Sequence, residues 1–131
     1  MVSKTHVSPS TIHTPFSQYS HAVSVEGAKK LIFCAGQVGG DEHGNILGPE
    51  SFEAQGELVM KNLERVLAEC GAKLTDVVKL VSYVCNPHDV ARVRALVKKH
   101  FPHNPPANTI CVLRGLAHPN YLLEIDATAV L

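Results

Sequence analysis

The sequence predicts an α+β domain in which one mixed sheet carries two helices on a single face. Two segments have the apolar spacing of amphipathic helices, and several others are rich in the β-branched and apolar residues typical of strands. These segments follow one another in the order β-β-α-β-α-β-β. The chain has 131 residues, so we expect a single domain over residues 1–131 with one buried core.

The first two strands are expected at residues 21–25 and 31–38. The first alternates polar and apolar residues, and the second, LIFCAGQV, is mostly apolar. Because only residues 26–30 separate them, we expect these strands to pair as a β-hairpin. Residues 39–49 are rich in glycine and other turn-forming residues, which indicates a loop.

An amphipathic helix is expected at residues 51–70, with Ser51 as its N-cap and Gly71 at the C′ position that follows it. Its apolar face consists of Leu58, Val59, Leu63, Val66, Leu67 and Cys70. The next segment, residues 76–85, is dense in β-branched residues and is expected to be a strand.

A second helix is expected to follow Asn86, which is a suitable cap, with Pro87 at the first position. Its apolar face consists of Val90, Val93, Val97 and Phe101. Two further strands, residues 108–114 and 121–130, complete the chain and are joined by a loop of glycine, proline and asparagine.

The last expected strand has two faces of different character. One set is apolar and suits a core beneath the helices: Tyr121, Leu123, Ile125, Ala127 and Ala129. The opposite set mixes apolar and acidic residues: Leu122, Glu124, Asp126, Thr128 and Val130. Such a face is too charged for a core and too apolar for free solvent, so we expect it to be covered by further copies of the chain.

The composition argues against several classes of protein. Twelve basic residues balance twelve acidic ones, and no basic stripe is present, so a nucleic-acid partner is not expected. No apolar run reaches the length of about 18 residues that a membrane span requires, and the N-terminus lacks a hydrophobic signal core. The cysteines and histidines show no metal-ligand spacing, so we expect reduced cysteines, no metal and a cytoplasmic location.

Several stretches resemble the Rid family, the reactive intermediate deaminases also called YjgF-type proteins. They are YSHAV at 19–23, FCAGQV at 33–38, GELVMKNLERVLAECGAKLTDVVKL at 56–80, PPAN at 105–108 and LEIDATAV at 123–130. The resemblance extends over nearly the whole chain. Its combination of AGQ, the helix-to-strand unit and the LEIDATAV terminus is specific.

The resemblance implies a chorismate-mutase-like fold assembled as a homotrimer, with an inner barrel of sheets and three clefts between neighbouring subunits. Deaminating members hydrolyse small enamines or imines, such as 2-aminoacrylate, without a metal or an organic cofactor. In these members an arginine at the start of the penultimate strand binds the substrate carboxylate. A glutamate on the last strand positions the attacking water, and a tyrosine near the N-terminus lines the cleft.

Carried over residue by residue, the family's glutamate corresponds to Glu124 and its tyrosine to Tyr19. The glycine of its SGQ-like motif corresponds to Gly36, which follows Ala35 here instead of a serine. The arginine of its PPAR-type motif is replaced by Asn108. The resemblance thus implies catalytic roles for Glu124 and Asn108 and substrate-binding roles for Tyr19, Gly36 and Asn108.

The replaced arginine changes what the cleft can bind. An amide cannot neutralise a carboxylate, so an otherwise unchanged cleft is expected to bind a small carboxylate roughly ten- to a thousandfold more weakly. Arg114 has the same side-chain parity but lies about 20 Å further along the strand. His21 and His118 are other candidate donors that the sequence does not place.

Three interpretations of Asn108 remain open: a cap for the turn after Pro106, a hydrogen-bonding group for a neutral substrate, or part of a cleft that only binds. Glu124 is interpreted either as a base beside a water or as a structural acid across the trimer seam, and Asp126 could share either role. Tyr19 could simply pack at the cleft rim.

The favoured hypothesis is a hydrolytic deaminase that acts on a small imine, enamine or related amine in an intersubunit cleft. One version is the breakdown of a nitrogen-containing aromatic, with a substrate of the 2-aminomuconate type. The alternative is a non-catalytic small-molecule-binding or interaction protein on the same trimeric scaffold. Ribonuclease activity is disfavoured by the neutral charge balance.

Overall fold

The computed structural model describes residues 1–48 and 51–131 and has a four-stranded main sheet. Its strands, in their spatial order, are β3 (Leu31–Gln37), β6 (Leu123–Val130), β4 (Val77–Val84) and β5 (Ala107–Val112). The pair β4 and β5 is parallel, and the other neighbours are antiparallel. The sheet is therefore mixed, as predicted.

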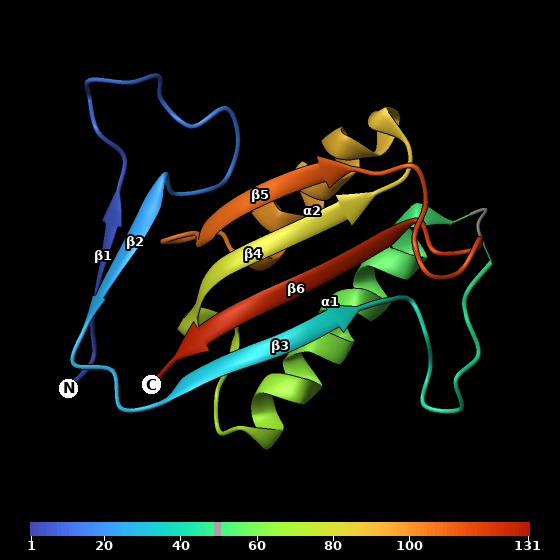
Figure 1. Ribbon diagram of the computed structural model, residues 1–131, viewed down its shortest axis with the longest axis horizontal. Coiled ribbons are helices and arrows are strands. Elements are labelled where there is room, and N and C mark those ends of the chain that lie inside the picture. Colours follow the sequence, from blue (N-terminus) through green and yellow to red (C-terminus); the bar gives the residue numbers. More distant parts are fainter. Residues whose placement is uncertain (49–50) are drawn as a thin grey trace.

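Two helices, α1 (Phe52–Glu69) and α2 (Val90–His100), lie on the same face of this sheet (Figure 1). The predicted α+β class with both helices on one face is confirmed. The loop predicted at residues 39–49 is described as far as Gly48, and Pro49 lies outside the described residues. Within residues 1–48 and 51–131, no helix combines the length and apolar character needed to cross a membrane.

The predicted helix caps are present. The Ser51 hydroxyl accepts a hydrogen bond from the Ala54 N–H at 3.2 Å, and Gly71 has the positive φ of 80° that a C′ glycine provides. Asn86 also caps, but its side chain accepts from His88 in a short 3-10 turn, Pro87–Asp89. The second helix proper therefore begins at Val90, later than its cap suggested.

The predicted hairpin between residues 21–25 and 31–38 is wrong. Instead, β1 (Ser3–Val7) and β2 (Ala22–Glu26) pair antiparallel in a separate two-stranded sheet, and β3 pairs with β6. The connection after β2 is held by Leu131, because the backbone N–H groups of Lys29 and Lys30 both donate to its main-chain oxygen. These bonds align β3 with the last strand rather than with β2.

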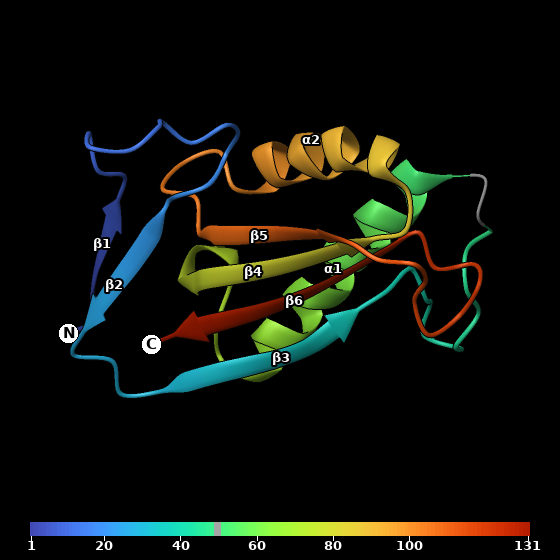
Figure 2. The ribbon, with the colours of Figure 1, turned by 45° about the horizontal axis from the view of Figure 1, so that its top comes forward.

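The core lies between the sheet and the helices, and it contains four of the five apolar residues predicted for the last strand; the fifth, Tyr121, lies before β6 and is only partly buried. Leu123, Ile125, Ala127 and Ala129 are at most 2% exposed. They pack against buried residues of α1: Val59, Met60, Leu63 and Leu67. The sheet's other face is not covered by a helix (Figure 2), and it exposes 59% of Leu31 and 75% of Phe33 from β3.

The fully buried side chain of Gln55 joins α1 to two loops. Its amino group donates to the carbonyls of Leu47, Gly48 and Asn120, and its oxygen accepts from the Leu122 N–H at 3.0 Å. These bonds fix the loop after β3 and the loop before β6 to one helix. The position at which β6 begins, and therefore that of Glu124, depends on this contact.

Candidate functional site

The residues predicted to form the site fall into two separate groups in one subunit. Tyr19 and Asn108 line one hollow. Gly36 and Glu124 lie against each other on neighbouring strands β3 and β6. The first group lies on the helix side of the sheet and the second on the uncovered side.

Asn108 is placed on the helix side by its register. It lies opposite Leu80 of the parallel neighbour β4, and Leu80 is fully buried in the core. Its side-chain oxygen accepts a hydrogen bond from the hydroxyl of the buried Ser82 at 3.1 Å. Since Ser82 uses the oxygen, the amino end of Asn108 is the end left to meet a ligand.

The hollow beside Asn108 has a volume of about 300 Å³. The segment before β2 contributes Phe16, Ser17 and Tyr19, and the Tyr19 hydroxyl oxygen accepts from the Phe16 N–H at 3.2 Å. This segment is braced by ring contacts, with His13 stacked on Phe16 at 4.1 Å. The remaining wall is formed by β5 and by Arg94 of α2.

Gly36 and Glu124 form the second group at an irregularity in β3. The pairing of β3 with β6 shifts register between Cys34 and Gln37, which places Gly36 directly beside Glu124. A Cβ atom at position 36 would lie 2.7 Å from the Glu124 Cδ. Only glycine therefore leaves the Glu124 carboxyl in its place.

Polar residues that the sequence did not single out surround Glu124 on the uncovered face. Tyr83 lies opposite Glu124 in one neighbour and opposite Cys111 in the other. Its hydroxyl donates to the Asp126 carboxylate at 3.1 Å, and this bond raises the pKa of Tyr83, with a further contribution from burial and the nearby acidic charges. Tyr83 and Cys111 could be assigned to this face only once the strand pairing was known.

The two groups cannot act on one small molecule within one subunit. Asn108 is level with Leu80 of β4, which in turn lies opposite Ala127 of β6. Glu124 is three residues from Ala127, so the backbones of Asn108 and Glu124 are separated by about 10 Å across the strands and about 10 Å along them. Their side chains also lie on opposite faces of the sheet. One copy of the chain therefore does not bring Asn108 and Glu124 to the same small molecule.

The three residues considered as substitutes for the missing arginine lie in different environments. Arg114 is exposed beyond the end of β5. His21 bonds through Nε2 to the His13 carbonyl oxygen, and His118 accepts from the Asn120 N–H. Arg94 was not among the predicted site residues, but it lines the hollow beside Asn108. Arg94 is four residues after Val90 and three before Val97, and this spacing could have placed it beside the helix's apolar face from the sequence.

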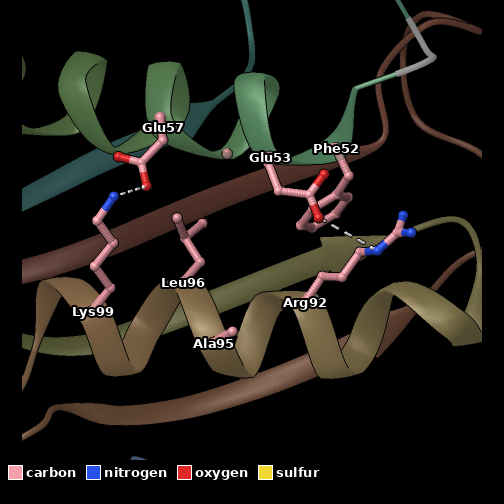
Figure 3. A pocket seen from close by; sticks show the side chains of 8 residues that line it. Phe52, Glu53, Glu57, Arg92, Ala95, Leu96 and Lys99 are labelled. Atoms are coloured by element: carbon pink, nitrogen blue, oxygen red, sulfur yellow. Dashed lines mark hydrogen bonds and ion pairs between the residues drawn. The ribbon is translucent and has the colours of Figure 1, made fainter.

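Another hollow, of about 370 Å³, lies between α1 and α2 (Figure 3). Its charged walls are already paired, because Lys99 donates to Glu57 at 2.7 Å and Arg92 lies 3.6 Å from Glu53. The bond from Lys99 lowers the pKa of Glu57. None of the predicted site residues lines this hollow, so the hollow beside Asn108 is the stronger candidate.

Metal ligands are not grouped in the part of the chain described. No cluster of three His, Cys, Asp or Glu residues suitable for a metal ion occurs in residues 1–48 and 51–131. The thiols of Cys34, Cys70, Cys85 and Cys111 are free. Burial raises the pKa of the Cys34 thiol, which disfavours the reactive thiolate at that position.

Comparisons with known proteins agree on one group. The family model described as Endoribonuclease L-PSP matches residues 11–131. A RutC family protein from Pyrococcus abyssi is 30% identical over 115 residues, which cover 88% of this chain and 87% of the length of that relative. The 2-iminobutanoate/2-iminopropanoate deaminase of Rattus norvegicus is 29% identical over 124 residues, with coverages of 95% and 88%.

A solved structure resembles the whole chain. It is a Rid-family protein of unknown function, YyfB, from Yersinia pestis. It superposes with a TM-score of 0.87 and 34% sequence identity, covering 98% of both chains.

Proposed function

This chain belongs to the Endoribonuclease L-PSP family, the group called Rid or YjgF-type above, and on this basis we propose that it is a hydrolytic deaminase of small imines or enamines. The observation that carries the proposal is the position of the Glu124 carboxyl on the uncovered face of the sheet, in space left free because residue 36 is glycine. The name of the rat relative, an imine deaminase, supports the same reaction.

The proposed reaction is an addition followed by an elimination. The Glu124 carboxylate takes a proton from water as the water oxygen bonds to the imine carbon, and the C=N π electrons move to nitrogen. Glu124 returns that proton to the nitrogen, which gives a neutral carbinolamine. It then transfers the hydroxyl proton of this adduct to the same nitrogen, so the C–N bond breaks as the oxygen electrons form the carbonyl, and ammonia leaves. An enamine first becomes the imine by gaining a proton at carbon and losing one from nitrogen. The balanced reaction consumes only substrate and water.

We further propose that the protein is a homotrimer whose site is shared between subunits. Exposed Leu31 and Phe33 on the uncovered face support an assembly that buries this face. The separation of Asn108 from Glu124 within one subunit supports the sharing. In the shared cleft, Asn108 and Tyr19 of one subunit hold the substrate, and Glu124 and Gly36 of its neighbour supply the water.

Mixed trimers test both proposals. Asn108→Asp keeps the acceptor for Ser82 but replaces the ligand-facing amino group with an oxygen, and Glu124→Gln removes the base. Each variant alone is expected to be nearly inactive in ammonia release. Trimers reassembled from equal amounts of both are expected to recover about a quarter of wild-type activity, because one interface in four combines two intact halves.

The substrate panel for this assay includes freshly generated 2-aminoacrylate, 2-iminobutanoate and a 2-aminomuconate. Wild-type turnover without recovery in mixed trimers would contradict the sharing of the site. Ligand-dependent stabilisation of wild type without any turnover would contradict the deaminase and favour a binding protein on the same scaffold.

Gly36→Ala is expected to lower turnover at least tenfold while leaving the fold intact. The added Cβ would displace the Glu124 carboxyl, and a flexible side chain can move without disrupting the core. Gly115→Ala is the matched control, because a Cβ there meets no atom within 4 Å. Ammonia release and thermal unfolding of both variants check this, and equal activity in both would contradict it.

A further inference from the structure

We propose that Arg94 of α2 supplies the cation that binds a carboxylate group of the substrate in the hollow beside Asn108. This inference rests on the proposed function for the reaction, and it adds which side chain of this protein binds the charged group of the substrate. The arginine expected at position 108 is absent, but Arg94 and Asn108 line the same cavity of about 300 Å³. The charge would thus come from a different element of the fold.

The guanidinium of Arg94 is available for a ligand. Arg94 is exposed and makes no hydrogen bond or ion pair with any other residue of 1–48 and 51–131. Arg92, two residues earlier on the same helix, instead bonds Asp89 at 3.1 Å and lies 3.6 Å from Glu53. No acidic residue lines the hollow, so no carboxylate there neutralises the charge of the Arg94 guanidinium.

The position of Arg94 on α2 places its side chain near β5, the edge strand of the main sheet. Arg94 is four residues after Val90 and three before Val97, which is 1% exposed beneath the helix. These spacings place Arg94 at the rim of the packed face. Figure 2 shows that α2 lies over β5, and Arg94 lines the same hollow as Asn108, which is the second residue of that strand.

Two neutral donors face the same space. The Asn108 oxygen is held by Ser82, so its amino group remains to donate. The Tyr19 oxygen accepts from the Phe16 N–H, which leaves the tyrosine's own hydrogen to donate. A carboxylate has lone pairs for all three donors, and a guanidinium adds charge-assisted bonds that the amide alone cannot. Ile110 and Phe16 provide apolar wall for the carbon chain.

The decisive measurement is the affinity for 2-oxobutanoate, a stable oxygen analogue of a small imino acid, with uncharged 2-butanone as its comparison. Calorimetric titration would use the full-length assembled wild type, Arg94→Gln and Arg65→Gln. Arg65 is exposed on α1 outside the hollow and provides the matched control. Glutamine preserves helix propensity, so both variants are expected to fold.

Arg94→Gln is expected to weaken 2-oxobutanoate binding tenfold or more, whereas Arg65→Gln leaves it unchanged. Binding to wild type is expected to weaken with added salt, and this dependence is expected to diminish in Arg94→Gln. The inference is overturned if wild type does not bind 2-oxobutanoate at millimolar concentrations, or if Arg94→Gln binds as wild type does.

Turnover separates this inference from the proposed function. Arg94-dependent binding with no ammonia release from any imine would uphold the anion site and overturn the deaminase. Turnover that Glu124→Gln abolishes but Arg94→Gln leaves unchanged in kcat/KM would uphold the deaminase and overturn the role of Arg94.

Discussion

Glu124→Gln is expected to lower kcat for imine hydrolysis by about 10²–10⁴-fold, because glutamine keeps the side chain's size but cannot take a proton from water. The substitution is not expected to unfold the protein, since glutamine has nearly the same shape as the Glu124 side chain, which packs against Gly36. Ammonia release under single-turnover conditions measures the chemical step directly.

Asp126→Asn is the matched control on the same strand and face. Asparagine retains an oxygen that can accept from the Tyr83 hydroxyl, so activity is expected to change less than tenfold. The pKa of Tyr83 is expected to fall toward its ordinary value, because a neutral acceptor no longer favours the protonated phenol. If Asp126→Asn lost as much activity as Glu124→Gln, Glu124 would not be the specific base.

Gln55→Leu is expected to destabilise the protein by about 3 kcal/mol, which corresponds to more than a hundredfold in the unfolding equilibrium. Leucine is similar in size but leaves the Leu122 N–H and the loop carbonyls without their fully buried partner. Chemical denaturation at a fixed protein concentration measures the change, since an assembled protein's stability depends on concentration.

The control for Gln55→Leu is Lys61→Leu, at an exposed position of the same helix. Its effect is expected to stay within about 0.5 kcal/mol. A Gln55→Leu protein with the wild-type denaturation midpoint would show that the loops are held by other contacts. Its activity is also expected to fall, because the loop before β6 positions the strand that carries Glu124.

The elements with strong local signals were predictable from the sequence. The helix after Ser51 has a cap, a terminal glycine and an apolar stripe, and the structure contains all of them. The pairing of β2 was not predictable in this way. A long loop separates it from its partner β1, and the sequence of β1 is mostly polar and has no clear strand pattern. Strand pairing depends on contacts between distant residues, which local patterns do not encode.

The candidate site shows the same division. The alternation of the last strand placed Leu123 and Ile125 in the core, and so placed Glu124 on the opposite face. The helix-side position of Asn108 required the register with Leu80, and the proximity of Arg94 required the packing of α2 over β5. Side chains brought together from separate elements were therefore the part that only the structure revealed.

The hydrogen bond from Ser82 to Asn108 is expected to couple the effects of substitutions at these two positions. An arginine at position 108 carries only donors, so it would face the buried Ser82 hydroxyl with no acceptor. Asn108→Arg alone is therefore expected to destabilise the protein by about 1–3 kcal/mol. In a Ser82→Ala background the same change is expected to cost less, because no buried hydroxyl is left without an acceptor, so the order of the two substitutions decides how stable the intermediate is.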